Sequence, residues 1–267
     1  MAQRKRLSGA QTSSQAKRPS GSQAAPEDED DQTFTLPSSS QVLRGMESLA
    51  PGQLEQKTAE VVQYFLVKDQ KKFAIRRADI VKHVLKEQRN IYPEVMRRAA
   101  ATFQQVFGLK LVEIEQKNHL YILINSLEPS AAAPPSSSTN PKTGLLFVVL
   151  GLIFMKGGVA RENVVWSTLK KLRIDPREKH EEFGDVRKLL TEEFVRQRYL
   201  EYIRIPHTDP VEFEFGWGQR AEYEVSKPRI LSFMGELHQQ DPQTWSQQYR
   251  EAHSSSSSTP SPSPSQR

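Results

Sequence analysis

Cysteine is absent from all 267 residues of the chain. This excludes disulfides, zinc sites built from thiolates such as a RING finger, and cysteine nucleophiles, and it fits a reducing compartment without proving one. The 6 histidines form no i, i+4 pair and no HExxH pattern. Because these spacings are typical of zinc-binding helices, we expect no metal site.

Long apolar segments and catalytic motifs are missing as well. The longest apolar run, Leu145 to Met155, is much shorter than the roughly 20 residues that cross a bilayer. The first residues lack the apolar centre of a signal peptide, so we expect a soluble protein without a membrane contact that is not secreted. No phosphate-binding GxxxxGK[ST] loop or GxSxG elbow occurs. We therefore predict no enzyme, no catalytic residue, no cofactor and no small-molecule substrate.

Basic charge is present and unevenly distributed. The chain has 37 basic and 32 acidic residues, a net charge of +5 and a pI of about 9.3. Between Lys68 and Arg98, ten basic residues oppose four acidic ones, so this segment alone carries +6 (10 − 4). A patch of this size favours a polyanionic partner, although a solvated charged face explains the same count.

The two ends of the chain differ in composition from its middle. Residues 1–52 are rich in serine, glutamine and charge, and residues 253–267 form a serine/proline tail, so we expect both to be disordered. Near the N-terminus, ten residues separate two basic clusters, as in a bipartite nuclear-import signal. The clusters consist of Arg4, Lys5, Arg6, Lys17 and Arg18.

The stretch from Thr191 to Gly218 gives the clearest indication of the fold. Its apolar spacing changes from three or four residues around Leu190 and Phe194 to strict alternation from Tyr199 onward. Alternation resumes after a polar turn, between Val211 and Phe215. A helix that leads into a two-stranded hairpin is the second half of a winged helix. Such a fold contacts DNA with a helix or wing, or docks proteins through apolar grooves.

The same order of elements is predicted twice. Residues 53–128 show three helical patterns, the third with Val106 and Phe107 inward and Gly108 as its end, followed by two strand patterns. A Pro/Ser/Ala linker covers residues 129–142. Residues 143–252 then repeat three helices, the second with Leu172 inward, and a hairpin with a C-terminal helical extension. We predict a mainly α protein with small β-hairpins, built from two tandem winged-helix modules with disordered termini.

Several sequence blocks resemble the MAGE homology family, over nearly the whole folded length from about Gln53 to Ala252. The matching blocks are VVQYFLVKDQKK, RADIVKHV, FGLKLVEIE, YILINSLEP, TGLLFVVLGLIFMKG and YLEYIRIPHTDPVEFEFGWG. Within the family, the chain is most similar to the branch that supplies a non-SMC subunit to the chromosome-maintenance complex built on SMC subunits five and six. The features that indicate this branch are KDQKK, FVRQRY and HQQDPQTWSQQYREA.

This resemblance implies a non-catalytic scaffold that binds a RING-type E3 ubiquitin ligase subunit and a kleisin, together with the SMC subunits. It also implies stimulation of the ligase and binding of double-stranded DNA in recombinational repair. We then expect the protein in the nucleus, on chromatin, with the cytoplasm as a second location. The alternative is a substrate adaptor for a ubiquitin ligase, as in the wider MAGE group, without DNA binding. The resemblance disfavours a third candidate function, that of a sequence-specific transcription factor.

For the RING-type partner, the resemblance points to two large aliphatic residues late in the first helix. The matching positions are Phe65 and Leu66, where phenylalanine departs from the usual di-leucine. Adjacent helical residues point about 100° apart, so we expect one to pack internally while the other helps form a surface patch. Burial of both inside the module is the alternative.

Two basic sets are candidates for DNA contacts. The resemblance assigns the kleisin and DNA side to the second module, where the candidates are Arg187, Lys188, Arg196, Arg198 and Arg204. Phosphate contacts from them would be independent of base sequence and sensitive to salt; salt bridges with nearby glutamates are the alternative. The charge count gives a second candidate patch, formed by Arg76, Arg77, Lys82 and Lys86. For the kleisin, Leu231 and Phe233 could line a groove for an apolar helix face, with core packing as the alternative.

Overall fold

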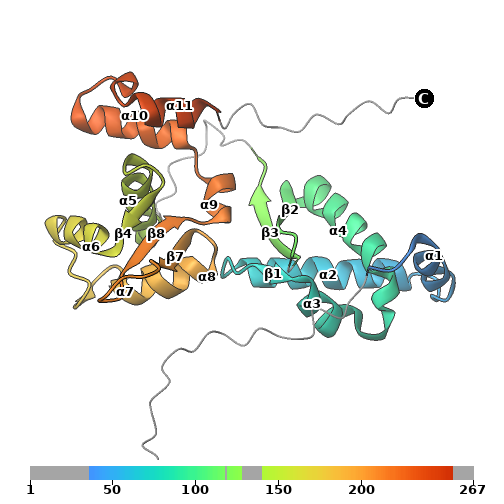
Figure 1. The fold of residues 1–267 in the computed structure, drawn as a ribbon. Coiled ribbons are helices and arrows are strands. Elements are labelled where there is room, and N and C mark those ends of the chain that lie inside the picture. The colour runs from blue at the N-terminus through green and yellow to red at the C-terminus, as the bar shows by residue number, and fades with distance from the viewer. Residues whose placement is uncertain (1–35, 118, 128–139, 255–267) are drawn as a thin grey trace, which may run out of the picture.

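The computed structural model describes residues 36–117, 119–127 and 140–254. Residues 36–127 form a first module and residues 140–254 form a second one beside it (Figure 1). The predicted import clusters and the distal parts of both predicted tails lie outside the described residues. Within the described ranges, every helix is too short or too polar to cross a membrane. No group of three potential ligand side chains in these ranges is placed to hold a metal ion.

The first module consists of α1, three further helical segments and a wing. Its elements in chain order are α1 (Ser39–Glu47), α2 (Gln53–Asp69), β1 (Ile75–Arg76), α3 (Arg77–Ile80), a π-helical turn (Val81–Leu85), a 3-10 helix (Lys86–Ile91), α4 (Tyr92–Phe107), β2 (Leu109–Glu115) and β3 (Leu120–Asn125). α4 ends at Gly108, whose φ of 62° is a left-handed conformation that glycine adopts without penalty. The three strands form an antiparallel sheet in the order β1-β3-β2, with a bulge between Glu113 and Glu115.

The core of the first module lies between α2, α4 and the sheet. It includes Val61, Phe65, Ile80, Leu85, Val95, Ala99, Phe103 and Leu123, all of which are buried. Phe65 packs edge to face against Phe103, with ring centroids 5.6 Å apart. The helical spacing of these apolar positions is the pattern that predicts the helices from the sequence.

The second module repeats this order and adds helices at its C-terminus. Its elements are α5 (Pro141–Met155), β4 (Val159–Arg161), α6 (Glu162–Lys171), β5 (Lys179–His180), β6 (Gly184–Asp185), α7 (Val186–Lys188), a π-helical turn (Leu189–Glu193), α8 (Phe194–Arg196), β7 (Leu200–Arg204), β8 (Phe213–Trp217), α9 (Gln219–Glu224), α10 (Lys227–His238), a 3-10 helix (Pro242–Thr244) and α11 (Ser246–Ser254). The wing sheet is antiparallel in the order β4-β8-β7, and β5 pairs with β6. Three helices followed by a hairpin thus occur in both modules, which confirms the predicted fold class.

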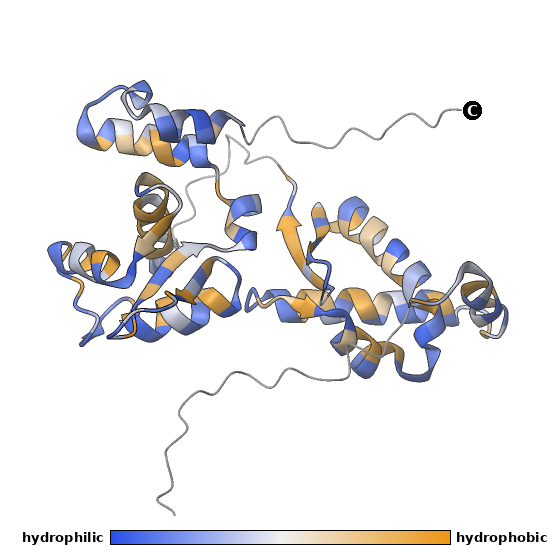
Figure 2. Ribbon diagram, in the orientation of Figure 1, coloured by the Kyte–Doolittle hydropathy of each residue, from blue (hydrophilic) through white to orange (hydrophobic). Residues whose placement is uncertain are grey.

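The core of the second module is built around α5. Figure 2 shows that this helix is apolar along most of its length, whereas α11 is mainly hydrophilic. α10 and α11 cover one side of α5 (Figure 1), and Ile230 and Ala252 bring apolar side chains from them into the core. Trp245 packs against this core as well. The C-terminal extension is therefore an integral part of the second module.

Two predicted segment boundaries are wrong. α1 lies inside the segment predicted to be disordered, because Ser38 forms a capping box with Gln41 and because Met46 and Leu49 pack against the first-module core. α5 begins inside the predicted linker, because the Asn140 side chain accepts a hydrogen bond from the Lys142 N–H and starts the helix. In both cases one capping residue determines the start of a helix within a polar stretch.

Three apolar residues predicted to point inward lie at the surface. Val106 is 70% exposed, Phe107 is 41% exposed and Leu172 is 52% exposed. Val106 and Phe107 occupy the last turn of α4, and Leu172 follows α6, where the neighbouring elements no longer cover the helix. For Val106 and Phe107 this exposure has a functional consequence, because both line a groove.

Candidate partner-binding surfaces

A concave apolar surface lies between α2 and α4 of the first module. We call it the α2/α4 groove; it encloses about 750 Å³. Its lining residues include Thr58, Ala59, Val62, Leu66, Val67, Val106 and Phe107. Val67 is 56% exposed and Val106 is 70% exposed, so their side chains are accessible. A groove of this kind between two helices is suited to docking an apolar face of a partner.

The structure separates the two residues predicted to contact the RING-type partner. Leu66 is half-buried and lines the α2/α4 groove. Phe65 is fully buried in the core, where it contacts Phe103 and Tyr121. The expected division between an internal and a surface residue therefore holds, but the assignment of Phe65 as a partner contact is corrected, because a partner cannot reach its side chain.

Charged side chains next to the α2/α4 groove are held in place by Glu94. Its carboxylate accepts hydrogen bonds from Arg97 and Arg98 at 2.7 Å each, and Arg98 also donates to Glu55 of α2 at 3.0 Å. The hydrogen bonds from Arg97 and Arg98 lower the pKa of Glu94 to about 2. Both arginines and Glu55 line the groove, so its apolar surface is bordered by an ordered network of ion pairs.

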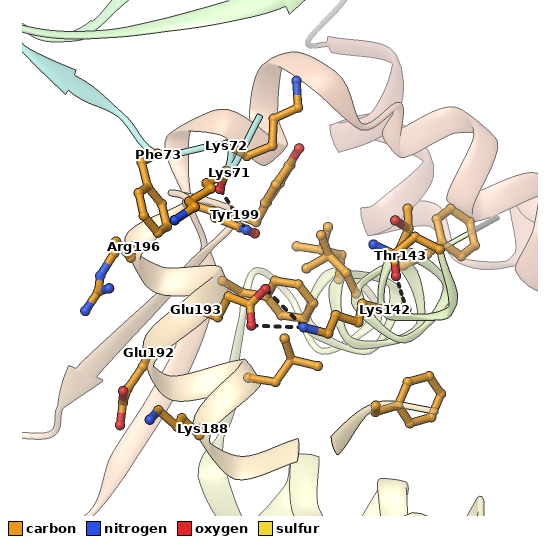
Figure 3. A pocket seen from close by; sticks show the side chains of 18 of the residues that line it. Lys71, Lys72, Phe73, Lys142, Thr143, Lys188, Glu192, Glu193, Arg196 and Tyr199 are labelled. Carbon is orange, nitrogen blue, oxygen red and sulfur yellow. Dashed lines mark hydrogen bonds and ion pairs between the residues drawn. The ribbon is translucent and has the colours of Figure 1, made fainter. Parts of the chain in front are cut away.

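A second concave surface lies between the two modules. We call it the inter-module cleft; it encloses about 1100 Å³. One wall is the segment Gln70–Phe73 that follows α2, and the others come from α5 and the α7–α8 helix, as Figure 3 shows. The apolar part of the lining consists of Phe73, Leu146, Phe147, Leu150, Phe183, Leu189, Phe194 and Val225. Because both modules contribute, the shape of this cleft depends on how the modules are oriented.

The charged lining of the inter-module cleft is nearly balanced. Five cations (Lys71, Lys72, Lys142, Lys188 and Arg196) face four acids (Asp185, Glu192, Glu193 and Glu224), which leaves +1 (5 − 4). Lys142 donates to both carboxylate oxygens of Glu193, at 3.1 and 3.3 Å (Figure 3). DNA backbone contacts require a clear excess of positive charge. The cleft is therefore better suited to a polypeptide that carries both apolar and charged side chains.

The structure distributes the five DNA candidates of the second module over different places. Lys188 and Arg196 line the inter-module cleft, and Arg196 lies over the ring of Phe73 at 5.5 Å. Arg187 forms an ion pair with Glu162 of α6 at 3.0 Å, which matches the salt-bridge alternative. Arg204 is exposed at the end of β7 on the wing. These side chains do not form one continuous patch.

Arg198 occupies the junction between the modules. Its φ of 65° is a left-handed conformation at the end of α8, where glycine is usually favoured. The N–H of Tyr199 donates to the Phe194 carbonyl at 2.9 Å, so the backbone closes the helix in a Schellman motif. The Arg198 guanidinium lies 3.7 Å from the carboxylate of Glu115 in the first module. This residue therefore ends a helix and approaches the neighbouring module.

The candidate patch of the first module is only partly available. Lys82 and Lys86 are exposed, and Arg76 is half-buried in β1. Arg77 is only 5% exposed, which corrects its assignment as a DNA contact, because a phosphate cannot reach a side chain at this depth. The sequence did not indicate this burial, because arginine is rarely buried and Arg77 forms a basic pair with Arg76.

A further basic segment follows α6, and the sequence reasoning did not single it out. We call it the α6 basic segment; its exposed cations are Lys170, Lys171, Arg173, Arg177 and Lys179. Only Asp175 and Glu178 oppose them, so residues 170–179 carry +3 (5 − 2). Within the part of the chain that the structure describes, none of these five cations forms an ion pair. The sequence does contain a signal for this segment, namely the run KKLR at residues 170–173 followed by two further cations.

The two kleisin candidates on α10 also differ in exposure. Leu231 is 1% exposed and belongs to the second-module core, which is the alternative that the sequence left open. Phe233 is 45% exposed and packs edge to face on Phe147, with ring centroids 5.5 Å apart. Because Phe147 lines the inter-module cleft, Phe233 extends the apolar surface of that cleft onto α10.

Comparison with known proteins connects these surfaces to a family. Residues 61–228 match the model of the MAGE homology domain. Over 202 residues, 75% of this chain, the sequence is 54% identical to the human and mouse proteins named "Non-structural maintenance of chromosomes element 3 homolog", of which the match covers 66% and 72%. It is 45% identical over 200 residues, 74% of this chain, to human "Melanoma-associated antigen D2", of which the match covers 33%.

A solved structure gives the same result. A chain of the "Nse1-Nse3-Nse4 complex" is 52% identical to this one and superimposes with a TM-score of 0.72, over 77% of this chain and 100% of that chain. The predicted resemblance, both to the MAGE homology family and to its chromosome-maintenance branch, is thereby confirmed. With its two winged-helix modules and this match over most of its folded length, the chain belongs to the MAGE homology domain family.

Proposed function

We propose that this protein is a non-catalytic scaffold subunit of the chromosome-maintenance complex built on SMC subunits five and six. It holds a RING-type E3 ubiquitin ligase subunit and a kleisin, stimulates the ligase and contributes to binding of double-stranded DNA in recombinational repair. One observation carries the proposal: two separate concave surfaces, one on the first module and one between the modules. Similarity to a chain of a solved three-component complex supports two protein partners.

The α2/α4 groove is the surface that we propose for the RING-type ligase subunit. It is apolar, lies on the first module alone, and contains Leu66 of the pair to which the family resemblance points. Val67, Val106 and Phe107 enlarge the apolar area beyond what the pair provides. Arg97 and Arg98 at its border offer charge-assisted hydrogen bonds that fix the orientation of a partner.

The inter-module cleft, with Phe233 as its extension, is the surface that we propose for the kleisin. Its lining combines apolar side chains with both signs of charge, which is typical of a protein-binding site. Because the two partners use different surfaces, one chain can hold both at once. We propose that joining the ligase to the chromosome complex in this way is how the protein stimulates it.

For DNA, the exposed cations outside the cleft are the best candidates. The α6 basic segment and Arg204 lie on the second module, and Lys82 and Lys86 lie on the first. Contacts of these side chains with phosphates release counterions, so the affinity falls as salt rises. We propose the nucleus as the location because the proposed partner is DNA, with the cytoplasm as a second location; the predicted import clusters are consistent with this.

A titration of labelled duplex DNA, followed by fluorescence anisotropy across a salt series, tests the DNA part of the proposal. It is done with the chain alone and with its purified RING-type and kleisin partners. We expect binding that tightens in the trimer and weakens steeply with salt. The double variants Lys170→Glu/Arg173→Glu and Lys82→Glu/Lys86→Glu identify the surface. The matched control is Lys156→Glu/Arg250→Glu, at exposed positions outside the wings and outside the tested segments. Each lost phosphate contact lowers the salt slope by about 1.

The second candidate is a substrate adaptor for a ubiquitin ligase that does not bind DNA. The nearly neutral cleft lining favours it, because such a surface also accepts a substrate protein. Stable pairing with a RING-type partner, with no response of labelled DNA in either form at low salt, would establish the adaptor and exclude the chromosome scaffold.

A further inference from the structure

A charged side chain is buried at the junction between the modules. Arg220, in the first turn of α9, is 0% exposed and is the largest of the fully buried side chains in the described ranges. α9 itself lies between the two modules (Figure 1). An arginine is almost never fully buried unless its charge and its donors are satisfied, so its partners indicate what it does.

Three of these partners belong to the first module. One terminal nitrogen of the guanidinium donates to the backbone carbonyl of Lys72 at 3.1 Å, and the other donates to that of Leu123 at 3.2 Å. The second nitrogen also lies 3.8 Å from the carboxylate of Asp69 at the end of α2. Arg220 therefore contacts both α2 with its following loop and the wing strand β3.

The remaining partners belong to the second module. Nε donates to the carbonyl of Gln197 at 2.9 Å, and a terminal nitrogen donates to Glu224 at 3.0 Å. The guanidinium lies 5.6 Å from the centre of the Tyr199 ring, and the Tyr199 hydroxyl donates to Glu224 at 2.5 Å. Burial, together with Glu224, raises the pKa of Tyr199, which keeps this hydroxyl a donor. One planar group thus satisfies acceptors from both modules at the same time.

The same contacts form part of the inter-module cleft. Lys72, Gln197, Tyr199 and Glu224 all line it, and Figure 3 shows Lys72 and Tyr199 at one end of the cleft. Gln197 adds a direct link, because its side-chain amide donates to the Lys71 carbonyl at 3.1 Å. Any rotation of one module against the other would separate these acceptors from Arg220 and leave a buried charge unpaired, which is costly.

We propose that Arg220 is a positioning residue for the inter-module cleft. It fixes the two modules at the orientation in which the walls of the cleft face a single bound segment. The identity of that segment, a kleisin, rests on the proposed function, but the role of Arg220 in orienting the modules does not. Lysine cannot replace it, because a single ammonium group is a compact point charge and lacks the planar fork that reaches acceptors on both sides.

Distance measurements between spin labels test the orientation directly. The chain has no cysteine, so labels attach only at introduced positions. Suitable substitutions are Gln104→Cys on α4 and Ser232→Cys on α10. Both positions are exposed, and each module receives one label. We expect one narrow distance distribution in the parent chain and in the control Arg229→Ala, which removes an exposed arginine. Arg220→Ala and Arg220→Lys should give a broad or shifted distribution while circular dichroism retains the helical signal.

An unchanged narrow distribution in a folded Arg220→Ala protein would overturn the proposal. Should that variant not fold, Arg220→Gln takes its place, because glutamine is neutral and fills much of the same volume. Its distribution is then decisive in the same way: a broad one supports the orienting role and an unchanged narrow one refutes it.

Partner binding gives the second readout. If only a fraction of the molecules has the correct orientation, the apparent affinity for a cleft partner falls by that fraction. We expect Arg220→Ala to weaken kleisin binding by about tenfold or more while RING-partner binding at the α2/α4 groove changes less than about twofold. Equal losses for both partners would contradict a role confined to the cleft. A parent chain that does not bind the kleisin would refute the proposed function, and the spin-label distances would still decide the role of Arg220.

Discussion

At the scale of single residues, Glu94 shows how a surface carboxylate is stabilised by its neighbours. Hydrogen bonds from Arg97 and Arg98 favour its ionised form, and its pKa falls from 4.5 to about 2. Because the folded-state pKa is depressed, Glu94 stabilises the fold above its unfolded pKa, and this contribution is lost as pH falls toward the folded value. The relevant window is therefore between about pH 4.5 and about pH 2.

We predict that Glu94→Gln flattens the acid dependence of stability in this window. The measurement is urea unfolding at several pH values, compared between the parent chain and the variant. Glu87→Gln, which removes an exposed glutamate of the first module, is the matched control and should follow the parent chain. If the parent chain and Glu94→Gln lost stability equally as pH falls through this window, the contacts of Glu94 with the two arginines would not stabilise the fold.

Gly218 makes a close backbone approach that no other residue permits. A Cβ atom at this position would lie 2.3 Å from the carbonyl oxygen of Arg198. We predict that Gly218→Ala lowers the free energy of unfolding by about 1–3 kcal/mol. Gly144→Ala is the control with the opposite sign, because a Cβ on Gly144 in α5 meets nothing within 4 Å and alanine favours helix. Thermal and urea unfolding measure the stability of both variants. Equal changes in the free energy of unfolding would refute the close backbone approach as the cause.

At the scale of elements, α2 carries two functions on two faces. One face places Phe65 in the core, and the other places Leu66 and Val67 in the α2/α4 groove. Truncating Phe65 to alanine therefore removes core packing, whereas a charge at the exposed Val67 changes the surface that a partner would cover. Leu66 lies between these cases, because it lines the groove and also packs against the core.

We predict that Phe65→Ala lowers stability by about 3–5 kcal/mol. Val67→Asp, by contrast, keeps the melting temperature within a few degrees and abolishes co-elution with the RING-type partner on gel filtration. Leu66→Asp also abolishes co-elution but lowers the melting temperature further, because Leu66 packs against the core as well. Gln56→Asp, an exposed position of α2 outside the groove, is the control that should retain pairing. If the folded Leu66→Asp and Val67→Asp variants still paired with the RING-type partner as well as the parent chain does, the partner would not bind in this groove.

At the scale of the whole molecule, the protein has two cores joined by a polar junction. The buried residues of each module form their own cluster, and no buried residue belongs to both clusters in the described ranges. The junction depends instead on Arg220, on the Gln197 amide and on the approach of Arg198 to Glu115. Separate cores predict separate folding, and a polar junction predicts that separation lowers stability only moderately.

We predict that residues 36–127 and residues 140–254, expressed apart, each unfold cooperatively, with melting temperatures below that of the intact chain. Differential scanning calorimetry of each fragment and of their equimolar mixture measures this. A fragment that lacks a cooperative transition would mean that the junction, and not the separate cores, determines the fold.

Local patterns in the sequence determined much of the architecture. The apolar spacing around Val61 and Phe65 and around Val95 and Phe103 predicted two helices, and alternation before and after Pro206 predicted a wing. Such patterns are reliable because the period of a helix or strand repeats within a few residues. The family was indicated separately, by sequence blocks such as VVQYFLVKDQKK, and its model matches residues 61–228.

Only the tertiary structure decided which of the regularly spaced residues are buried and which are accessible. Val106 continues the apolar pattern of α4 but lines a groove, and Arg77 lies in a basic run but is buried. Arg220 gave no local signal at all, because its acceptors at Leu123 and Lys72 are 97 and 148 residues away in the chain. A sequence pattern reports the neighbours along the chain, whereas burial and the junction of the modules depend on contacts between segments that only folding brings together.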